Sequence, residues 1–90
     1  MTDFEWNPRK EAENVLKHGV SFREAASAFY DTLSTIVPDP EHSVGEERYV
    51  LLSLSNQGRL LVVCHTNRGA RLRLISARQA SSAEVKACEI

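Results

Sequence analysis

The stretch YVLLSLSNQGRLLVVCHTNRGARLRLISA, residues 49–77, decides the fold. It contains three runs of strand-forming residues, 49–55, 60–66 and 70–77, and Gly58 and Gly69 end the two short segments between them. Glycine adopts the positive φ angles that tight hairpin turns require. The pattern therefore predicts an antiparallel meander of three strands.

Arginine is the second feature of this region. Residues 48–78 contain no Asp or Glu. Cations without anions between them are typical of a surface that binds phosphate or an acidic partner. Strict alternation places Arg71 and Arg73 on the face opposite Leu72 and Leu74, which we expect to pack on helices. The alternative is a solvated sheet face whose arginines confer solubility. The arginines are Arg48, Arg59, Arg68, Arg71, Arg73 and Arg78.

Charge is divided unevenly along the chain. Residues 1–47 carry four cations and ten anions, and residues 48–90 carry seven cations and two anions. The two net charges, −6 and +5, sum to the −1 of the whole chain. This polarity indicates a binding surface on the second half. The alternative is that the two halves neutralise each other across the fold.

Length and composition indicate one small globular domain. The chain has 90 residues, of which 42% are hydrophobic and 26% charged, the usual values for a folded protein. No apolar run approaches the ~18 residues of a membrane span, and the N-terminus has no signal-peptide pattern, so we expect a cytoplasmic protein. Cys64 and Cys88 lack the paired spacing of a zinc site, and we expect both to be reduced thiols.

Two helices are predicted before the meander. Asn7 can cap the first helix, Pro8 suits its first position, and Gly19 ends it. The second helix begins with a capping box, in which Ser21 caps the first turn and Glu24 reaches back. The inward residues are expected to be Ala12, Val15 and Leu16 on the first helix, and Phe22, Ala25, Ala26 and Phe29 on the second.

The remaining elements complete an α+β fold. Short strands are predicted at 4–6 and 35–37, and a second capping box at 81–84 begins a C-terminal helix with Val85 and Cys88 facing inward. The predicted architecture is a twisted antiparallel sheet with two N-terminal helices packed on one face and a short C-terminal helix.

Groups able to transfer protons occur before and within the meander. Residues 42–48, HSVGEER, combine an imidazole, carboxylates and a guanidinium, which are the groups that an RNA-cleaving site needs. An ordinary loop in which Glu46 pairs with Arg48 would explain the same residues. His65 is a second candidate acid or base near neutral pH, and a structural histidine is the alternative. The chain contains no P-loop, dinucleotide-binding or metal-binding motif.

Four motifs are spread over almost the whole chain: EWNP at 5–8, KHGVSF at 17–22, HSxGExR at 42–48 and RxISAR at 73–78. In this order they resemble the BrnT family, the ribonuclease toxins of a bacterial type II toxin–antitoxin system. The resemblance implies a RelE-like fold and a metal-independent endoribonuclease, without a cofactor, that inhibits translation and growth. It implies an RNA substrate and a BrnA-type antitoxin with a ribbon-helix-helix domain. Operator DNA would be bound only through the toxin–antitoxin complex.

The resemblance also directs attention to particular side chains. We expect Arg73, Arg78 and Arg48 to stabilise the charge of the transition state. A non-catalytic module, whose arginine face binds an acidic partner or nucleic acid, is the competing hypothesis. The candidates for proton transfer are His65, His42, Glu46, Lys17 and His18, and those for substrate binding are Arg71, Arg68 and Arg59.

Overall fold

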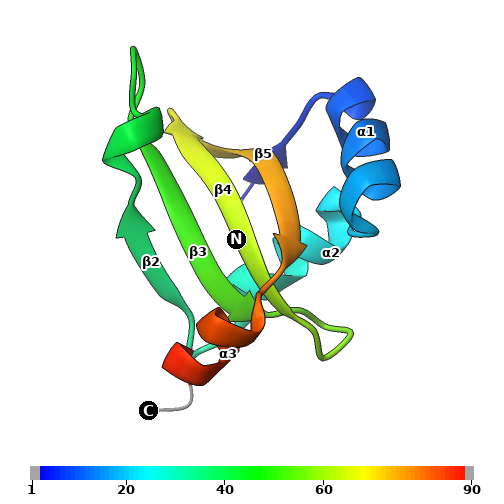
Figure 1. The fold of residues 1–90 in the computed structure, drawn as a ribbon. Coiled ribbons are helices and arrows are strands. Elements are labelled where there is room, and N and C mark those ends of the chain that lie inside the picture. The colour runs from blue at the N-terminus through cyan, green and yellow to red at the C-terminus, as the bar shows by residue number, and fades with distance from the viewer. Residues whose placement is uncertain (1–2, 89–90) are drawn as a thin grey trace.

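The computed structural model describes residues 3–88 and shows one five-stranded sheet with the strand order β1-β5-β4-β3-β2 (Figure 1). Helix α2 lies behind the sheet in this view, α1 lies alongside β5, and α3 crosses the front. The strands are β1 (Asp3–Glu5), β2 (Thr35–Pro38), β3 (Arg48–Leu54), β4 (Leu60–Arg68) and β5 (Arg71–Gln79). The helices are α1 (Pro8–His18), α2 (Phe22–Ser27) and α3 (Ser82–Cys88), with 3₁₀ turns at Ala28–Tyr30 and Pro40–His42.

The predicted meander is confirmed. Strands β3, β4 and β5 are consecutive antiparallel neighbours, and Gly58 and Gly69 occupy the turns with φ angles of +75° and +61°. The sheet is not wholly antiparallel, because β1 pairs with β5 in parallel. A parallel partner was not expected from the sequence, since the pairing joins the two ends of the chain and leaves no local signal.

The two faces of the sheet differ in what covers them. We call the face toward α2 the inner face and the opposite one the outer face.

The capping box that begins α2 is half confirmed: the Ser21 hydroxyl accepts the Glu24 N–H at 3.1 Å, but the Glu24 carboxylate does not bind the Ser21 N–H. Phe22 and Ala25 are buried as predicted, and Ala26 and Phe29 pack partly buried against the core. The buried core consists of Val20, Phe22, Ala25, Ala28, Leu51, Leu61, Val63, Leu74 and Ala77.

A β-bulge interrupts the alternation of β5. Ser76 lies opposite Cys64, but Leu74 lies opposite His65, so Ile75 is an extra residue without a partner on β4. One extra residue moves every later side chain to the other face. The strict alternation assumed from the sequence therefore ends at this point.

The bulge places Arg73 and Arg78 on the same face. Leu74 and Ala77, one on each side of the bulge, are both buried in the inner core. Their neighbours Arg73 and Arg78 consequently both point to the outer face, although an odd and an even position would separate in a regular strand. The bulge thus gathers the two arginines that the sequence singled out.

The prediction for the inward side of α1 was wrong. Val15 is 43% exposed, Leu16 is 89% exposed, and Ala12 also faces solvent. Asn14 faces inward instead, and its amide nitrogen donates to the carbonyls of Val20 and Ala77, both at 2.8 Å. Its amide oxygen accepts the Ala77 N–H at 3.0 Å. Strand β1 pairs with β5 only as far as Arg73. At Ala77 the Asn14 side chain therefore makes the backbone hydrogen bonds that a neighbouring strand would otherwise make.

The C-terminal helix begins as predicted, since the Ser81 hydroxyl accepts the Glu84 N–H at 3.3 Å and the Glu84 carboxylate accepts the Ser81 N–H at 2.7 Å. Val85 is half-buried, and the Cys88 side chain lies outside what the structure describes. Among the helices of residues 3–88, none is long and apolar enough to cross a membrane.

Candidate functional site

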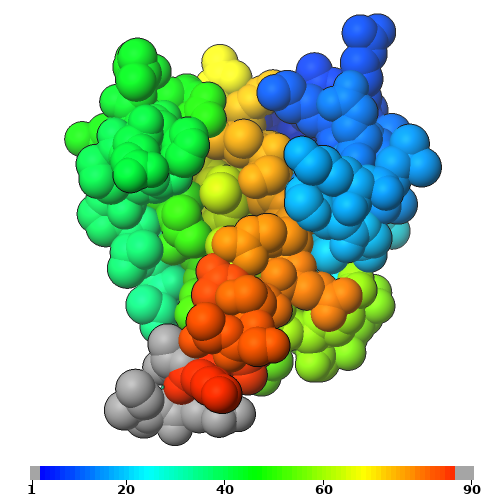
Figure 2. Space-filling model, in the orientation of Figure 1, coloured from blue at the N-terminus to red at the C-terminus, as the bar shows by residue number. Residues whose placement is uncertain are grey.

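The outer face carries a hollow of about 140 Å³ beside the segment that precedes β3. Figure 2 shows this face, with residues 35–50 in green on one side, α1 in blue on the other and α3 in red across one end. We call this space the His42 hollow. It is lined by Asp39, His42, Arg48, Cys64, Ile75 and Ser76.

His42 is held by a carboxylate at the end of the 3₁₀ turn. Its Nδ1 lies 2.7 Å from an oxygen of Asp39, and the imidazole remains 63% exposed. The Ser43 hydroxyl fixes the turn, because it donates to the Asp39 carbonyl at 2.7 Å and accepts the Arg48 N–H at 2.9 Å. With Nδ1 bound to Asp39, Nε2 is the nitrogen that remains for proton transfer.

Arg48 contributes a donor without an acceptor. Its Nε is the one buried side-chain nitrogen or oxygen, among the residues that the structure describes, that makes no hydrogen bond. Glu46 forms an ion pair with this atom at 3.5 Å but does not hydrogen-bond to it. An unsatisfied buried donor costs free energy, so it calls for a functional explanation. The Nε atom itself is closed to solvent, whereas the Arg48 side chain as a whole is 35% exposed, so a ligand in the hollow would reach the rest of the guanidinium.

Arg73 and Arg78 are paired, contrary to the expectation of an arginine face without anions. Arg73 donates to Glu5 at 3.0 Å, and Arg78 forms a two-pronged pair with Glu84 at 2.8 and 3.0 Å. The hydrogen bonds from Arg78, together with the one from the Ser81 N–H, lower the pKa of Glu84 to about 2. The acids lie outside residues 48–78, so inspection of that stretch alone could not reveal them. Charge neutralisation between distant segments is therefore part of the fold.

Arg59 is bound within the protein and lines neither hollow, and its assignment to substrate binding stays a prediction. It donates to both oxygens of Glu24 and to the Gly19 carbonyl. Glu24 is only 3% exposed, and the hydrogen bonds from Arg59 lower its pKa. This pair ties the β3–β4 hairpin to the start of α2. Arg68 and Arg71 lie opposite each other, exposed, at the tip of the next hairpin.

His65 is a core residue, which favours the structural alternative, and its role as an acid or base stays a prediction. It is 2% exposed on the inner face, with its ring 4.9 Å from Phe29 and 5.9 Å from Tyr49. Burial lowers its pKa, and its Nδ1 lies 3.2 Å from the Val63 carbonyl. Its cross-strand neighbours are Tyr49 and Leu74. The sheet separates it from the His42 hollow on the outer face.

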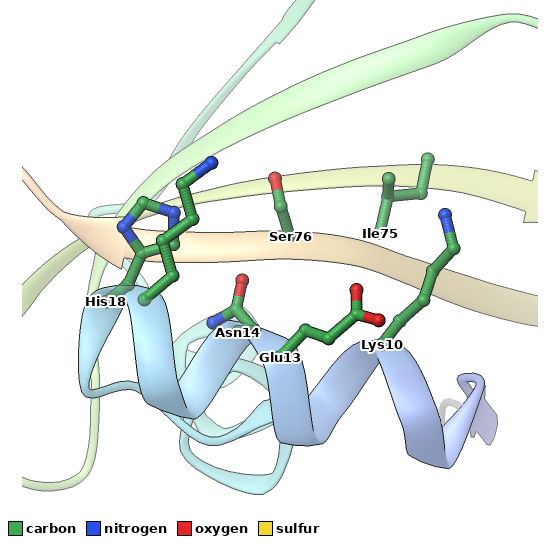
Figure 3. Close-up of a pocket in the computed structure, with 7 residues that line it drawn as sticks. Lys10, Glu13, Asn14, His18, Ile75 and Ser76 are labelled. Atoms are coloured by element: carbon green, nitrogen blue, oxygen red, sulfur yellow. The ribbon is translucent and has the colours of Figure 1, made fainter.

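A second hollow, of about 170 Å³, separates α1 from β5 (Figure 3). We call it the α1 hollow. The α1 hollow, not the His42 hollow, is lined by Lys17 and His18, which were predicted as proton carriers. Glu46, a third predicted proton carrier, forms its ion pair with Arg48. Lys10, missed as a site residue, shares the helix face of Lys17, as the seven-residue spacing could have indicated. The lining residues are Lys10, Glu13, Asn14, Lys17, His18, Ile75 and Ser76.

Other contributors to the His42 hollow were also missed. Asp39 was not among the predicted site residues, and its spacing of three residues from His42 was the signal that could have identified it. Cys64 was treated as a packed thiol, and it is half-buried in the floor of the hollow. The described part of the chain contains no group of three or more His, Cys, Asp or Glu side chains that could hold a metal ion.

Fold and site together define a small α+β protein with an acid–base pair and arginines on one open face of its sheet. A family model described as "Ribonuclease toxin, BrnT, of type II toxin-antitoxin system" matches residues 6–84, and the chain belongs to this family. The resemblance seen in the four motifs is thereby confirmed.

A solved relative shows the same fold. The crystal structure of the Brucella abortus ribonuclease toxin BrnT superimposes with a TM-score of 0.71 at 21% sequence identity. The match covers 91% of this chain and 100% of the other. A comparison with curated proteins finds no match.

Proposed function

We propose that this chain is a metal-independent endoribonuclease that cleaves RNA at the His42 hollow. The observation that carries the proposal is the convergence of two groups in one space. His42 is oriented there by Asp39, and Arg48 presents a buried donor without a partner. Family membership supports ribonuclease activity, and the geometry supplies the residues.

The proposed reaction needs one proton removed and one supplied. The ribose 2′-hydroxyl attacks the adjacent phosphorus, and the bond to the 5′-oxygen of the next nucleotide breaks. His42 takes the hydroxyl proton or donates one to the leaving oxygen, and Glu46, near Arg48, is the second candidate proton carrier. The products are a cyclic 2′,3′-phosphate and a free 5′-hydroxyl.

Arginines stabilise the charge that develops on the phosphorane. Arg48 lines the hollow, and the planar fork of its guanidinium matches phosphate oxygens better than an ammonium does. Arg73 and Arg78 flank the same face, but each already binds a carboxylate. RNA must therefore compete with Glu5 and Glu84 for these two side chains.

Cleavage of purified RNA, with and without EDTA, tests the activity. We expect cleavage in both conditions. An Asp39→Asn substitution should slow it about tenfold or more, because the neutral amide does not stabilise a protonated imidazole and its NH2 group can donate to Nδ1 and favour the other tautomer. Glu41→Gln changes an exposed carboxylate in the same turn and serves as the control. Loss of wild-type cleavage on chelation would contradict metal independence.

We further propose that the toxin inhibits translation and growth and is neutralised by a BrnA-type antitoxin, with operator DNA bound only through the complex. The carboxylates on Arg73 and Arg78 show that these side chains accept acidic partners in this fold. The same observation favours the second candidate function, a non-catalytic module for an acidic partner. A triple Arg71→Glu, Arg73→Glu, Arg78→Glu variant should lose antitoxin binding. Unchanged association would overturn the assignment of this face.

A further inference from the structure

The α1 hollow and the His42 hollow adjoin at β5. Ile75 and Ser76, at the β-bulge, line both of them. In Figure 3 the labelled side chains of Lys10, Glu13 and His18 lie on the side of α1 that borders this strand. A nucleic-acid strand that leaves the His42 hollow over Ser76 therefore enters the α1 hollow next.

The α1 hollow carries positive charge suited to a phosphate backbone. It contains two lysines, Lys10 and Lys17, against one glutamate, Glu13. The lysines are seven residues apart and so lie on one face of the helix, about 10 Å apart along its axis. Ammonium groups contact phosphate as point charges and read no base.

The other borders of the His42 hollow suit a polyanion less well. Toward β2 the surface is apolar, since Val37 is 48% exposed and Val44, in the segment between β2 and β3, is 86% exposed. Toward α3 the Glu84 carboxylate occupies the fork of Arg78. On the α1 side the border carries Lys10 and Lys17, neither of which forms an ion pair within residues 3–88.

We propose that the α1 hollow is a subsite for the RNA phosphates that flank the cleaved one, with Lys10 and Lys17 as its cations. The inference rests on the proposed function, because it assumes that the cleaved phosphate occupies the His42 hollow. Glu13 repels the backbone and limits the affinity of the subsite. The RNA strand thus runs from the turn that holds His42, across the bulge, to helix α1.

Binding of a non-cleavable RNA tests the subsite. The probe is a 2′-O-methyl oligoribonucleotide, whose blocked 2′-oxygen cannot attack. A Lys10→Ala, Lys17→Ala variant should bind it roughly tenfold more weakly, with a slope of log affinity against log salt that is lower by about 1.4, because each phosphate contact to a single strand contributes about 0.7. The matched control, Arg9→Ala with Arg23→Ala, removes two exposed cations outside both hollows. The control should bind within about twofold of wild type, and Glu13→Gln should bind more tightly.

Cleavage of two substrate lengths separates flanking contacts from contacts to the reacting phosphate. The lysine variant should lose about tenfold more kcat/KM on a long RNA than on a dinucleotide, which has a single phosphate. Equal losses on both would overturn the flanking subsite, as would unchanged binding and salt slope. If wild type cleaves no RNA, the proposed function fails. The binding measurement still decides whether the lysines hold a phosphate backbone, and undiminished RNA binding with weakened antitoxin binding would assign them to the acidic partner.

Discussion

His42 and His65 lie on opposite sides of one sheet and have opposite surroundings. His42 ends an exposed turn, and a carboxylate lies 2.7 Å from its ring. His65 is 2% exposed between two aromatic rings, where burial lowers its pKa. The same side chain is therefore packed in the core on the inner face, whereas on the outer face it is open to solvent, as the proposed proton transfer requires. A residue type indicates chemistry only together with its partners and its access to substrate.

Two arginines repeat this contrast. Arg59 binds a buried glutamate and a backbone carbonyl, so its donors are used within the protein. Arg48 keeps one buried donor without a hydrogen bond beside the His42 hollow. The comparison predicts that Arg59 and its partner govern stability, whereas Arg48 governs turnover.

The largest expected effect is on the outer face. Arg48→Ala should lower RNA cleavage by ~10²–10³, or about 2.7–4 kcal/mol of transition-state stabilisation, as for other donors aimed at developing charge. Arg48→Lys should recover little, because an ammonium lacks the planar fork. The melting midpoint of each variant shows whether it is folded. Wild-type cleavage by folded Arg48→Ala would remove this residue from the mechanism.

The next effect is on the inner face. Glu24→Gln should destabilise the protein by about 3 kcal/mol, because Arg59 then lies partly buried without its counter-ion. Urea denaturation measures the difference, with Glu41→Gln as the exposed control. Since the folded pKa of Glu24 is lowered, the pair stabilises above pH ~4.5 and this contribution is lost as acid titrates the carboxylate. A stable Glu24→Gln protein would show that the pair is dispensable.

Replacement of Asn14 tests how the bulged strand is held. Asn14→Leu leaves the N–H and carbonyl of Ala77 and the carbonyl of Val20 without this partner, which should cost about 2 kcal/mol of stability. Ala12→Leu introduces the same side chain at an exposed position of α1 and controls for it. A variant as stable as the control would mean that β5 does not need this substitute for a neighbouring strand.

The smallest effect is a pH dependence that originates at His65. Because the folded pKa of His65 is lowered, the folded protein binds less proton at this ring than the unfolded chain does below pH ~6.5. Stability therefore decreases as the pH falls, by at most about 1.4 kcal/mol per pH unit. His65→Phe keeps an aromatic ring and should remove this part of the slope. Equal slopes in both proteins, measured by denaturation between neutral pH and pH 5, would contradict the buried neutral imidazole.

Local patterns in the sequence predicted most of the fold. Gly58, Gly69, Asn7 and Ser21 act on their immediate neighbours, and the elements that they delimit were found where expected. The bulge at Ile75 shifts the register through pairing with β4, so alternation within one strand could not reveal it.

The site was predictable to the extent that its residues are close in sequence. His42 and Arg48 were recognised together because one short loop holds them. The partners of Arg73 and Arg59 are 68 and 35 residues away, so their pairing had no local signal. For the same reason the apolar stripe of α1 was misassigned, since the contact of Asn14 with Ala77 spans 63 residues.

The most direct test of the division between the two faces compares two histidine variants in one RNA cleavage assay. The rates of His42→Ala and His65→Phe are measured beside wild type, with the melting midpoint of each protein. We predict that His42→Ala loses ~10²-fold or more in rate while remaining folded, and that His65→Phe cleaves at close to the wild-type rate. Full activity of folded His42→Ala, together with an inactive folded His65→Phe, would contradict the assignment of catalysis to the outer face.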